Sequence, residues 1–450
     1  MKIRRVKWAS HPILANLELD FVDPISKVAF DTIILAGENG TGKSTILNAL
    51  STFLNIGSFE FFEFIEYEID GVIYSAVQQD KTSNRNFFDT INTSSADRVH
   101  ISSDKTFNFS KIGTEPSDLR GFGCVSSKAR SDYKSNKIIS TTASELDSDK
   151  YDDDKEDNFT YLKQLLVDIN SQDEHAFSEY HRTGNTIDYS VFRRTQSKMF
   201  RFSNAFNQFF GDLKFDCVKD SNGEKNVYFI KNGVGIPIDS LSTGEKQIVY
   251  RGAYLLRNQA KLSGGTVFID EPELSMHPLW EQKILSYFQG LFSNSGGQTS
   301  QLFVATHSEY VVEHALKQEH SAVITITNQS GIVTSTAANA PLVLPSIVAS
   351  EVNYVAFNVV STDYHIALYS EIQNRSNKFT IKDCDDYIVG LPEFDSTKHT
   401  KNSRHGSTTY ISLPTYIRNG IDHPDSGNVY TESEMRSSIE LMIEILRNHP

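Results

Sequence analysis

Residues 37–45 read Gly-Glu-Asn-Gly-Thr-Gly-Lys-Ser-Thr, and this stretch constrains the chain more than any other. It matches the phosphate-loop pattern G-x-x-x-x-G-K-[ST]. Glycines let backbone N–H groups wrap a phosphate, and the N-terminus of the following helix adds a favourable dipole. Lys43 offers a charge for the β- and γ-phosphates, and Ser44 offers a hydroxyl for Mg²⁺. The residues expected at the phosphates are Gly37, Glu38, Asn39, Gly40, Thr41, Gly42, Lys43, Ser44 and Thr45.

The sequence on either side of this loop has the context that the pattern needs. Residues 32–35 form a short apolar run, which is typical of a buried parallel strand. Residues 44–54 place apolar side chains at helical spacing. This order of strand, glycine loop and helix predicts an α/β fold that binds a nucleotide.

Residues 266–273, Thr-Val-Phe-Ile-Asp-Glu-Pro-Glu, predict a second buried strand that ends in carboxylates. Ligands of open α/β sheets bind at the carboxyl ends of the strands. We expect Asp270 to hold Mg²⁺ through water, and Glu271 to orient or deprotonate an attacking water. The alternative is an ordinary acidic strand end, which the glycine loop earlier in the chain disfavours.

Residues 241–247, Leu-Ser-Thr-Gly-Glu-Lys-Gln, precede a predicted helix over 245–258. They resemble the signature of ABC-type ATPases, which is close to LSGGQ, with Thr243 in place of a glycine. The resemblance implies that Ser242, Gly244 and Glu245 form a contact set for the γ-phosphate of ATP bound by a second copy. Ser242 and Glu245 also form a helix capping box, and both roles are compatible.

Two further positions follow from the same resemblance. Residues 302–308 predict a strand that ends at His307, which is similar to the family's switch histidine for the γ-phosphate. A structural histidine is the alternative. The family's Q-loop glutamine, a ligand of Mg²⁺ and water, has two candidates, Gln78 and Gln79. The metal set implied in this way is Ser44, Asp270 and Gln78.

The loop after the carboxylates separates branches of this family. Residues 271–278 read Glu-Pro-Glu-Leu-Ser-Met-His-Pro, which resembles soluble RecF/OLD-like ATPases rather than transporter subunits. OLD-like nucleases add a metal-binding Toprim domain, but Asp383 and Asp385 alone are a weak sign of one. The sequence has no sustained heptad pattern, so it does not predict a long coiled coil.

The motifs divide the chain into four predicted segments. The first part of the ATPase domain spans 1–80, and its second part spans 236–340. Between them, 81–235 is expected to be a polar insertion and a helical lobe, with helices over 159–182 and 190–210 and a hairpin over 213–230. The polar stretch 82–157 predicts a solvated loop or a partly disordered insertion, within which 122–125 is a possible strand. Residues 341–450 are expected to form a mostly helical domain that binds a partner or is HEPN-like.

Residues 414–424 contain Arg418 and His423, an Arg-x4-His arrangement that resembles the active-site motif of HEPN ribonucleases. In that family the arginine stabilises the phosphate and the histidine serves in acid–base cleavage. The alternative is that both residues cap helices or bind a partner. Gly420 is expected to interrupt the helix on which such a motif sits.

Charge and cysteine usage limit the remaining classes. The chain has 43 basic and 57 acidic side chains, a net charge of −14, which disfavours non-specific DNA binding by the chain as a whole. Its three cysteines form no disulfide pattern, and no apolar run is long enough to span a membrane. We therefore expect a protein of a reducing cytoplasm without membrane contact.

Several stretches together resemble a narrower group, the ATPase subunits of bacterial antiphage systems of the Septu type, including those attached to retrons. The resemblance covers 241–256, the loop 271–278, 363–369 and 413–419. It implies ATP and Mg²⁺ as cofactors, a head-to-tail dimer or larger homo-oligomer, an HNH-type nuclease subunit as partner, and nucleic acid reached through that complex. The alternatives are an ATP-gated ribonuclease acting through Arg418 and His423, and a transporter's nucleotide-binding subunit.

Overall fold

The computed structural model describes residues 1–449 except 57, 80–86, 102–114, 131, 150, 154–157, 222, 338–340 and 406–407. It forms two compact units. The first contains Met1–Leu35 and Asn39–Ser335, and the second contains Thr336–Pro450 with Ala36–Glu38. Among the described residues, no helix is both long and apolar enough to cross a bilayer.

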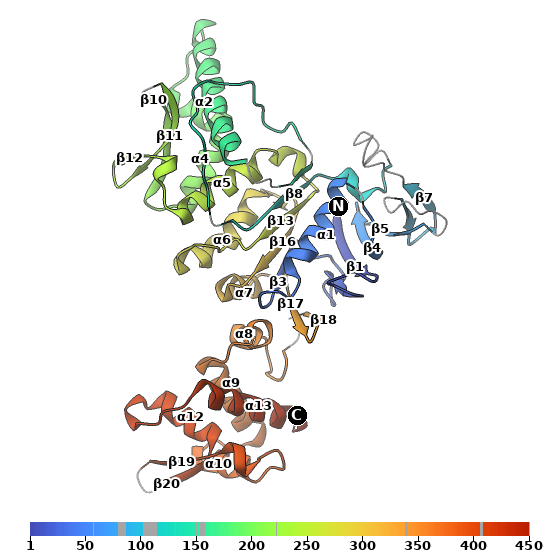
Figure 1. Ribbon diagram of the computed structural model, residues 1–450, viewed down its shortest axis with the longest axis vertical. Coiled ribbons are helices and arrows are strands. Elements are labelled where there is room, and N and C mark those ends of the chain that lie inside the picture. The colour runs from blue at the N-terminus through green and yellow to red at the C-terminus, as the bar shows by residue number, and fades with distance from the viewer. Residues whose placement is uncertain are drawn as a thin grey trace. The chain divides into compact units, whose positions relative to one another are not determined.

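A seven-stranded sheet forms the centre of the first unit (Figure 1). Strands β8, β9, β13 and β16 run parallel, with Asp270 of β13 paired to Ala305 of β16. Their apolar runs are buried on both faces, as parallel strands require. In spatial order the strands are β18 (Ile332–Ala337), β17 (Ser321–Gln329), β3 (Thr32–Ala36), β16 (Gln301–Thr306), β13 (Thr266–Asp270), β8 (Cys124–Ser127) and β9 (Tyr151–Asp153).

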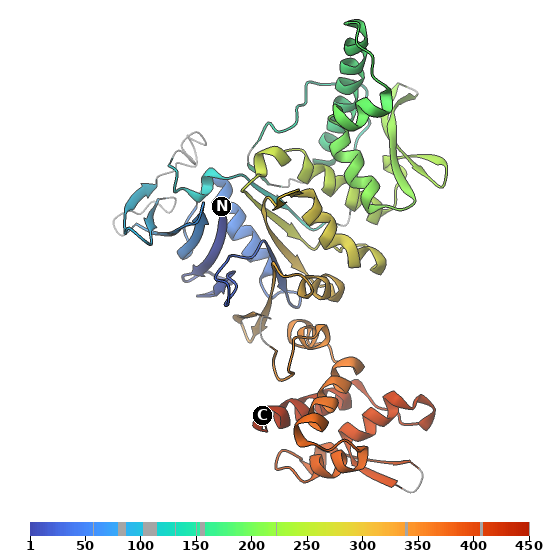
Figure 2. The ribbon, with the colours of Figure 1, turned by 180° about the vertical axis from the view of Figure 1, so that it is seen from behind.

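A six-stranded sheet lies on the other side of α1 (Lys43–Ile56), which both views place between the two sheets (Figures 1 and 2). Apolar residues of this sheet, of α1 and of the central strands form one continuous buried core, which fixes the helix that follows the phosphate loop. In spatial order the strands are β2 (Glu18–Asp20), β1 (Lys2–Trp8), β4 (Phe62–Ile69), β5 (Val72–Gln78), β6 (Phe88–Asn92) and β7 (Arg98–Ile101).

The opposite face of the central sheet is covered by helices (Figure 2). The three that carry or flank the motifs are α5 (Thr243–Leu256), α6 (Pro278–Leu291) and α7 (Glu309–Leu316). Beyond them lies a lobe of helices and a three-stranded sheet: α2 (Asn158–Arg182), α3 (Tyr189–Thr195), α4 (Phe200–Phe209), β10 (Leu213–Ser221), β11 (Glu224–Lys231) and β12 (Val234–Pro237). Short elements complete the unit: η2 (Leu119–Gly121), η3 (Ile238–Ser240), η4 (Gln259–Leu262), β14 (Ser293–Asn294) and β15 (Gly297–Gln298).

The lobe differs from the sequence prediction at one helix. A single helix was expected over 190–210, but the chain forms two, α3 and α4. The break has a clear cause, because the buried Asp173 carboxylate accepts hydrogen bonds from the backbone N–H groups of Lys198 and Met199 and from the Ser197 hydroxyl. These bonds compete with helix continuation and start α4. The hairpin over 213–230 is confirmed as β10 and β11, and Asn222 of its turn lies outside the described residues.

The prediction of a solvated loop over 82–157 is wrong for much of the part that the structure describes. Residues 88–92 and 98–101 are strands, and β8 lies fully buried beside β13. Two serines, Ser126 and Ser127, are 4% and 2% exposed in β8, so polar composition concealed a core strand. The possible strand at 122–125 is confirmed for Cys124 and Val125, which belong to β8, whereas Phe122 and Gly123 precede the strand.

The second unit is mostly helical and has its own apolar core. Its helix α12 runs through Gly420, so the expected interruption is wrong. An added Cβ at Gly420 would lie 3.0 Å from the Asn428 carbonyl oxygen, and close packing explains this glycine better than a helix break. The elements are α8 (Ala349–Phe357), α9 (Thr362–Ser376), α10 (Ile381–Val389), α11 (Ser396–His399), β19 (Thr400–His405), β20 (Thr408–Ser412), α12 (Leu413–Asp422), η5 (Pro424–Ser426) and α13 (Glu432–Asn448).

Candidate nucleotide-binding site

The glycine loop follows the buried strand β3 and ends where α1 begins at Lys43. Gly40 and Gly42 have φ angles of +79° and +99°, a region that favours glycine. A Cβ at Gly42 would also lie 2.9 Å from Leu14 Cδ2. The Gly42 carbonyl accepts the first helical hydrogen bond, from Ile46 N–H at 2.9 Å. The local sequence thus produces the strand–loop–helix geometry that a phosphate site needs.

Residues from three separate segments meet beside this loop. Lys43 Nζ lies 3.5 Å from His307 Nδ1, and His307 Nε2 lies 3.2 Å from Glu271 Oε1. The Ser44 hydroxyl is hydrogen-bonded to the Asp270 carboxylate. The parallel pairing of β13 with β16 explains the convergence, because it brings the carboxyl ends of both strands to one edge.

Burial perturbs the charged groups of this cluster. It lowers the pKa of Lys43 to about 8, against the opposing effect of the neighbouring carboxylates Asp270, Glu271 and Glu273. Burial also raises the pKa of Asp270 and of Glu273. Perturbed ionisable groups gathered at one sheet edge are a mark of a functional site.

Ser44 and Asp270 form a donor set that suits Mg²⁺. One Asp270 oxygen, Oδ1, is buried and has no hydrogen-bond partner among the described residues. A hydroxyl and a carboxylate are ligands that Mg²⁺ prefers, with water and phosphate oxygens completing its shell. Within the described ranges, no group of three or more His, Cys, Asp or Glu side chains could hold a metal by itself.

Glu273 is a site residue that the sequence interpretation did not assign. Its carboxylate is buried and accepts a hydrogen bond from His307 N–H at 2.7 Å. It therefore ties the loop after β13 to the end of β16. The Glu-Pro-Glu sequence of the loop could have indicated this second carboxylate. Only the pairing of β13 with β16 shows that Glu273 lies beside His307.

The signature stretch forms a complete helix cap. Ser242 Oγ accepts from Glu245 N–H, and Glu245 accepts from Ser242 N–H at 2.8 Å, which confirms the capping box. Burial acts to raise the pKa of Glu245, but hydrogen bonds from Lys231 and Ser242 outweigh it and lower the pKa. The Glu245 carboxylate is thus engaged within its own chain. Phosphate contact by Ser242 and Gly244 stays a prediction.

Of the two Q-loop candidates, Gln78 is the last residue of β5 in the six-stranded sheet, and Gln79 follows it. Gln79 donates to Asp89 Oδ1 at 2.8 Å, and the hydrogen bond of Gln78 is to the Phe87 carbonyl. The strand beside β13 is instead β8, which ends at Ser127 and is followed by Lys128. The contacts of Gln78 therefore give no support to metal binding by this residue. The sequence could not show which strand lies beside β13.

A cavity of about 310 Å³ opens beside the phosphate loop. Thr45, in the first turn of α1, lines it together with His11 and Phe61, whose rings contact each other edge-on with centroids 5.1 Å apart. Aromatic faces of this kind can stack on a planar base.

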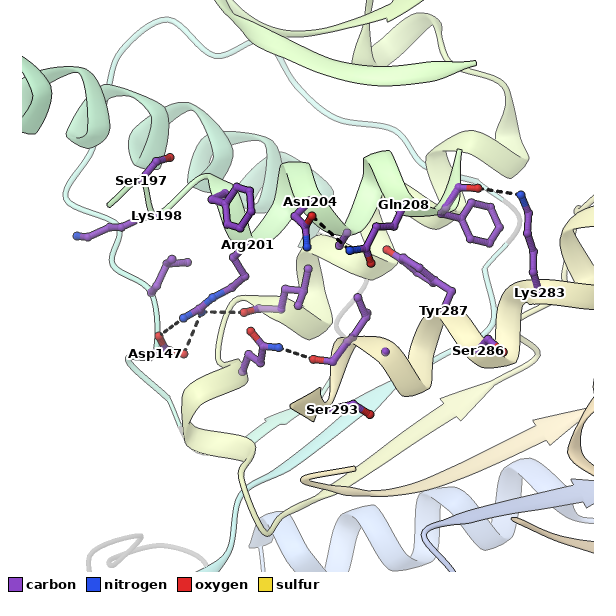
Figure 3. A pocket seen from close by; sticks show the side chains of 18 of the residues that line it. Asp147, Ser197, Lys198, Arg201, Asn204, Gln208, Lys283, Ser286, Tyr287 and Ser293 are labelled. Carbon is purple, nitrogen blue, oxygen red and sulfur yellow. Dashed lines mark hydrogen bonds and ion pairs between the residues drawn. The ribbon is translucent and has the colours of Figure 1, made fainter. Parts of the chain in front are cut away.

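A larger cavity, about 870 Å³, lies elsewhere in the first unit, and none of the predicted site residues lines it. Figure 3 shows Arg201 and Gln208 of α4 across from Lys283 and Tyr287 of α6. Two positively charged side chains that line it already have partners within the protein. Arg201 forms a bidentate ion pair with Asp147, and Lys283 donates to the Phe209 carbonyl at 2.8 Å. This cavity is distinct from the nucleotide site.

The second unit places its candidate residues in structural roles. Arg418 Nη2 is ion-paired with Asp422 at 2.6 Å, and His423 is the C-cap of α12. Asp385 is fully buried and accepts hydrogen bonds from Ile411 and Ser412, so it anchors β20 rather than facing a metal. Asp383 lies in the exposed first turn of α10.

Comparison with known proteins identifies the family. A model described as "AAA domain, putative AbiEii toxin, Type IV TA system" matches residues 33–313, well over half of the chain. The chain belongs to this AAA domain family. The match covers the glycine loop, the carboxylates and His307, and it confirms the expected α/β P-loop ATPase domain. The helices α8–α13 confirm the mostly helical region that follows.

Other similarities are more limited. A segment of 92 residues is 35% identical to the retron Vc95 probable ATPase of Vibrio cholerae serotype O1 biovar El Tor, covering 18% of this chain and 17% of that protein. The SMC head domain from Thermotoga maritima matches with a TM-score of 0.39 at 12% identity, over 76% of this chain and 100% of that one. An SmcHead bound to the C-winged helix domain of ScpA matches with a TM-score of 0.40 at 13% identity, over 75% and 97%.

Proposed function

We propose that this AAA domain protein binds and hydrolyses ATP with Mg²⁺ and acts as the switch subunit of a bacterial antiphage defence complex. One observation carries the enzymatic part: three distant segments bring His307 to 3.5 Å from Lys43 and to 3.2 Å from Glu271. Phosphoryl transfer needs positioned charges more than covalent chemistry, and this cluster supplies them.

Each residue has a distinct role in this proposal. Lys43 binds the β- and γ-phosphates, and Ser44 and Asp270 would hold Mg²⁺, whose charge offsets that of the phosphates. Glu271 orients the attacking water or takes its proton. His307, held 3.2 Å from Glu271, senses the γ-phosphate. The base enters the cavity at Phe61 and stacks on its ring.

The signature helix supports a second element of the proposal, an ATP-dependent head-to-tail dimer. Ser242 is exposed at the N-terminus of α5, where the helix dipole favours an anion. In the dimer Ser242 and Gly244 of one copy contact the γ-phosphate held by the other. ATP binding then favours the dimer because only the dimer makes these contacts.

The defence role is proposed from similarity. The 92-residue segment shared with a retron probable ATPase and the Septu-like stretches both support it. We propose an HNH-type nuclease subunit as partner, docked mainly outside the ATPase domain, with nucleic acid bound through the complex in the bacterial cytoplasm. Such coupling requires that the partner distinguish the two ATP states.

ATP turnover and binding by the purified chain test the enzymatic part. Lys43→Ala should abolish nucleotide binding, whereas Lys317→Ala, which removes an exposed lysine paired with Glu313, should leave it intact. Equal ATP binding by both variants would reject the site. Co-purification of the tagged chain from its native operon tests the partner: a stoichiometric nuclease subunit supports the switch role, and a pure homo-oligomer opposes it.

A further inference from the structure

Beyond its capping residue Glu245, helix α5 buries two further long polar side chains among mostly apolar residues. Gln247 and Arg251 are 0% and 3% exposed and lie one turn apart on the same face of the helix. A buried guanidinium is costly unless hydrogen bonds satisfy it. Their partners therefore indicate what these residues do.

The partners are backbone carbonyls of the loop that carries the catalytic carboxylates. Arg251 donates to the carbonyl oxygens of Asp270 at 3.0 Å and Glu271 at 3.1 Å. Gln247 Nε2 donates to the next carbonyl, that of Pro272, at 3.2 Å. Two side chains of one helix thus hold three consecutive peptide groups.

The same side chains also reach the segment that follows β8. Arg251 donates a further hydrogen bond to the Lys128 carbonyl, and Gln247 Oε1 accepts one from the Tyr133 hydroxyl at 2.6 Å. Because β8 lies beside β13 in the sheet, the two side chains connect both strand ends to α5. We refer to Gln247 and Arg251 as the carbonyl clamp.

The loop held by the clamp has an unusual backbone at its key residue. Glu271 has a φ of +43°, in the left-handed region that residues other than glycine rarely adopt. Strained conformations of this kind persist only where surrounding contacts determine them. The clamp supplies such contacts on the carbonyl side of Glu271, and the Ala305 carbonyl accepts from Glu271 N–H at 2.9 Å.

We propose that Arg251 and Gln247 are positioning residues, which hold the backbone of Glu271 so that its carboxylate faces the attacking water. This inference rests on the proposed ATPase function. It also gives α5 a second role, because the helix begins at the Ser242 cap and carries the clamp one to three turns further on. Contact of a γ-phosphate with the signature therefore acts on the same rigid element that holds the carboxylate loop.

The test compares kcat, KM and directly measured ATP affinity for Arg251→Met, Arg251→Lys and the wild-type chain. Misplacing a catalytic group by about 1 Å can reduce the rate on the order of 10²-fold. We expect Arg251→Met to lower kcat by about that factor while KM and ATP affinity change less than about twofold, since Lys43 and the glycine loop are untouched. Arg251→Lys retains donors and should recover part of the rate.

Arg201 provides a matched control, because its guanidinium also donates to a backbone carbonyl, that of Leu256 at 3.0 Å, away from the nucleotide site. Arg201→Met should leave kcat per folded molecule unchanged. Gln247→Leu is the second clamp variant if Arg251→Met does not fold. Unchanged kcat in the clamp variants, or an equal loss in Arg201→Met, would overturn the inference while leaving the ATPase proposal standing. A wild-type chain that hydrolyses no ATP would overturn both.

Discussion

Replacing Gly244 by alanine separates two reasons for a glycine in the signature stretch. An added Cβ would lie 2.9 Å from the Ser275 carbonyl oxygen and 3.2 Å from Trp280 Cζ3. Both neighbours belong to the same chain, so the steric conflict exists without any nucleotide. If glycine served only the approach of a phosphate from a second copy, the nucleotide-free protein would tolerate the alanine.

The structure sets the size of the expected effect. A backbone oxygen cannot move as a flexible side-chain end can, and overpacking of this kind costs about 1–3 kcal/mol. The helix-propensity gain of alanine is at most about 1 kcal/mol and is smaller in a first turn. We therefore expect Gly244→Ala to lower the free energy of unfolding by about 1–2 kcal/mol.

Equilibrium urea unfolding followed by tryptophan fluorescence measures this change. Both tryptophans, Trp8 and Trp280, lie in the first unit, so the signal reports its unfolding. Gly290→Ala is the matched control, because an added Cβ at this glycine of α6 would meet nothing within 4 Å apart from its chain neighbours and the backbone of its own helix, and alanine there should stabilise by up to about 1 kcal/mol. Equal unfolding midpoints for Gly244→Ala and wild type would refute the packing argument.

Three further predictions concern other parts of the chain. Burial lowers the pKa of His365 to about 3, so between about pH 6.5 and 3 only the unfolded state takes up a proton at this residue. The free energy of unfolding of the second unit should therefore fall by about 2 kcal/mol between pH 6.5 and 5. Urea unfolding of His365→Gln should lack this pH dependence. Phe61→Ala should raise KM for ATP about tenfold with kcat unchanged, because a base–aromatic stack is worth about 1–3 kcal/mol, and an unchanged KM would exclude this cavity as the base site. The purified chain alone should not cleave RNA, because Asp422 neutralises Arg418; cleavage that Arg418→Ala and His423→Ala remove would instead support the ribonuclease alternative.

The central strands and the phosphate loop could be predicted from the sequence because their signals are local. Residues 32–35 and 266–270 are apolar runs that end at a glycine loop or at paired carboxylates, and each needs only its own residues to be recognised. The capping box at Ser242 is local in the same sense. These features fix which residues reach the edge of the sheet.

What could not be predicted depends on which strands become neighbours. Two of the four residues of β8 are serines, and it lies within a polar stretch, so composition suggested a loop although the strand is buried against β13. The Q-loop candidates were chosen without knowing that β5 belongs to a different sheet. Arg251 lies in the apolar part of α5, and its carbonyl partners are known only once α5 lies over the carboxylate loop.

The molar mass of the Glu271→Gln variant with and without ATP and Mg²⁺ tests the central claim most directly. Glu271→Gln should bind ATP without hydrolysing it, and light scattering should then show a mass twice that of the nucleotide-free chain. Adding Ser242→Arg, which places a bulky side chain at the exposed cap, should restore the nucleotide-free mass. An ATP switch completed by a second copy predicts both results. The same molar mass of Glu271→Gln with and without ATP, or a doubling that Ser242→Arg does not affect, would contradict it.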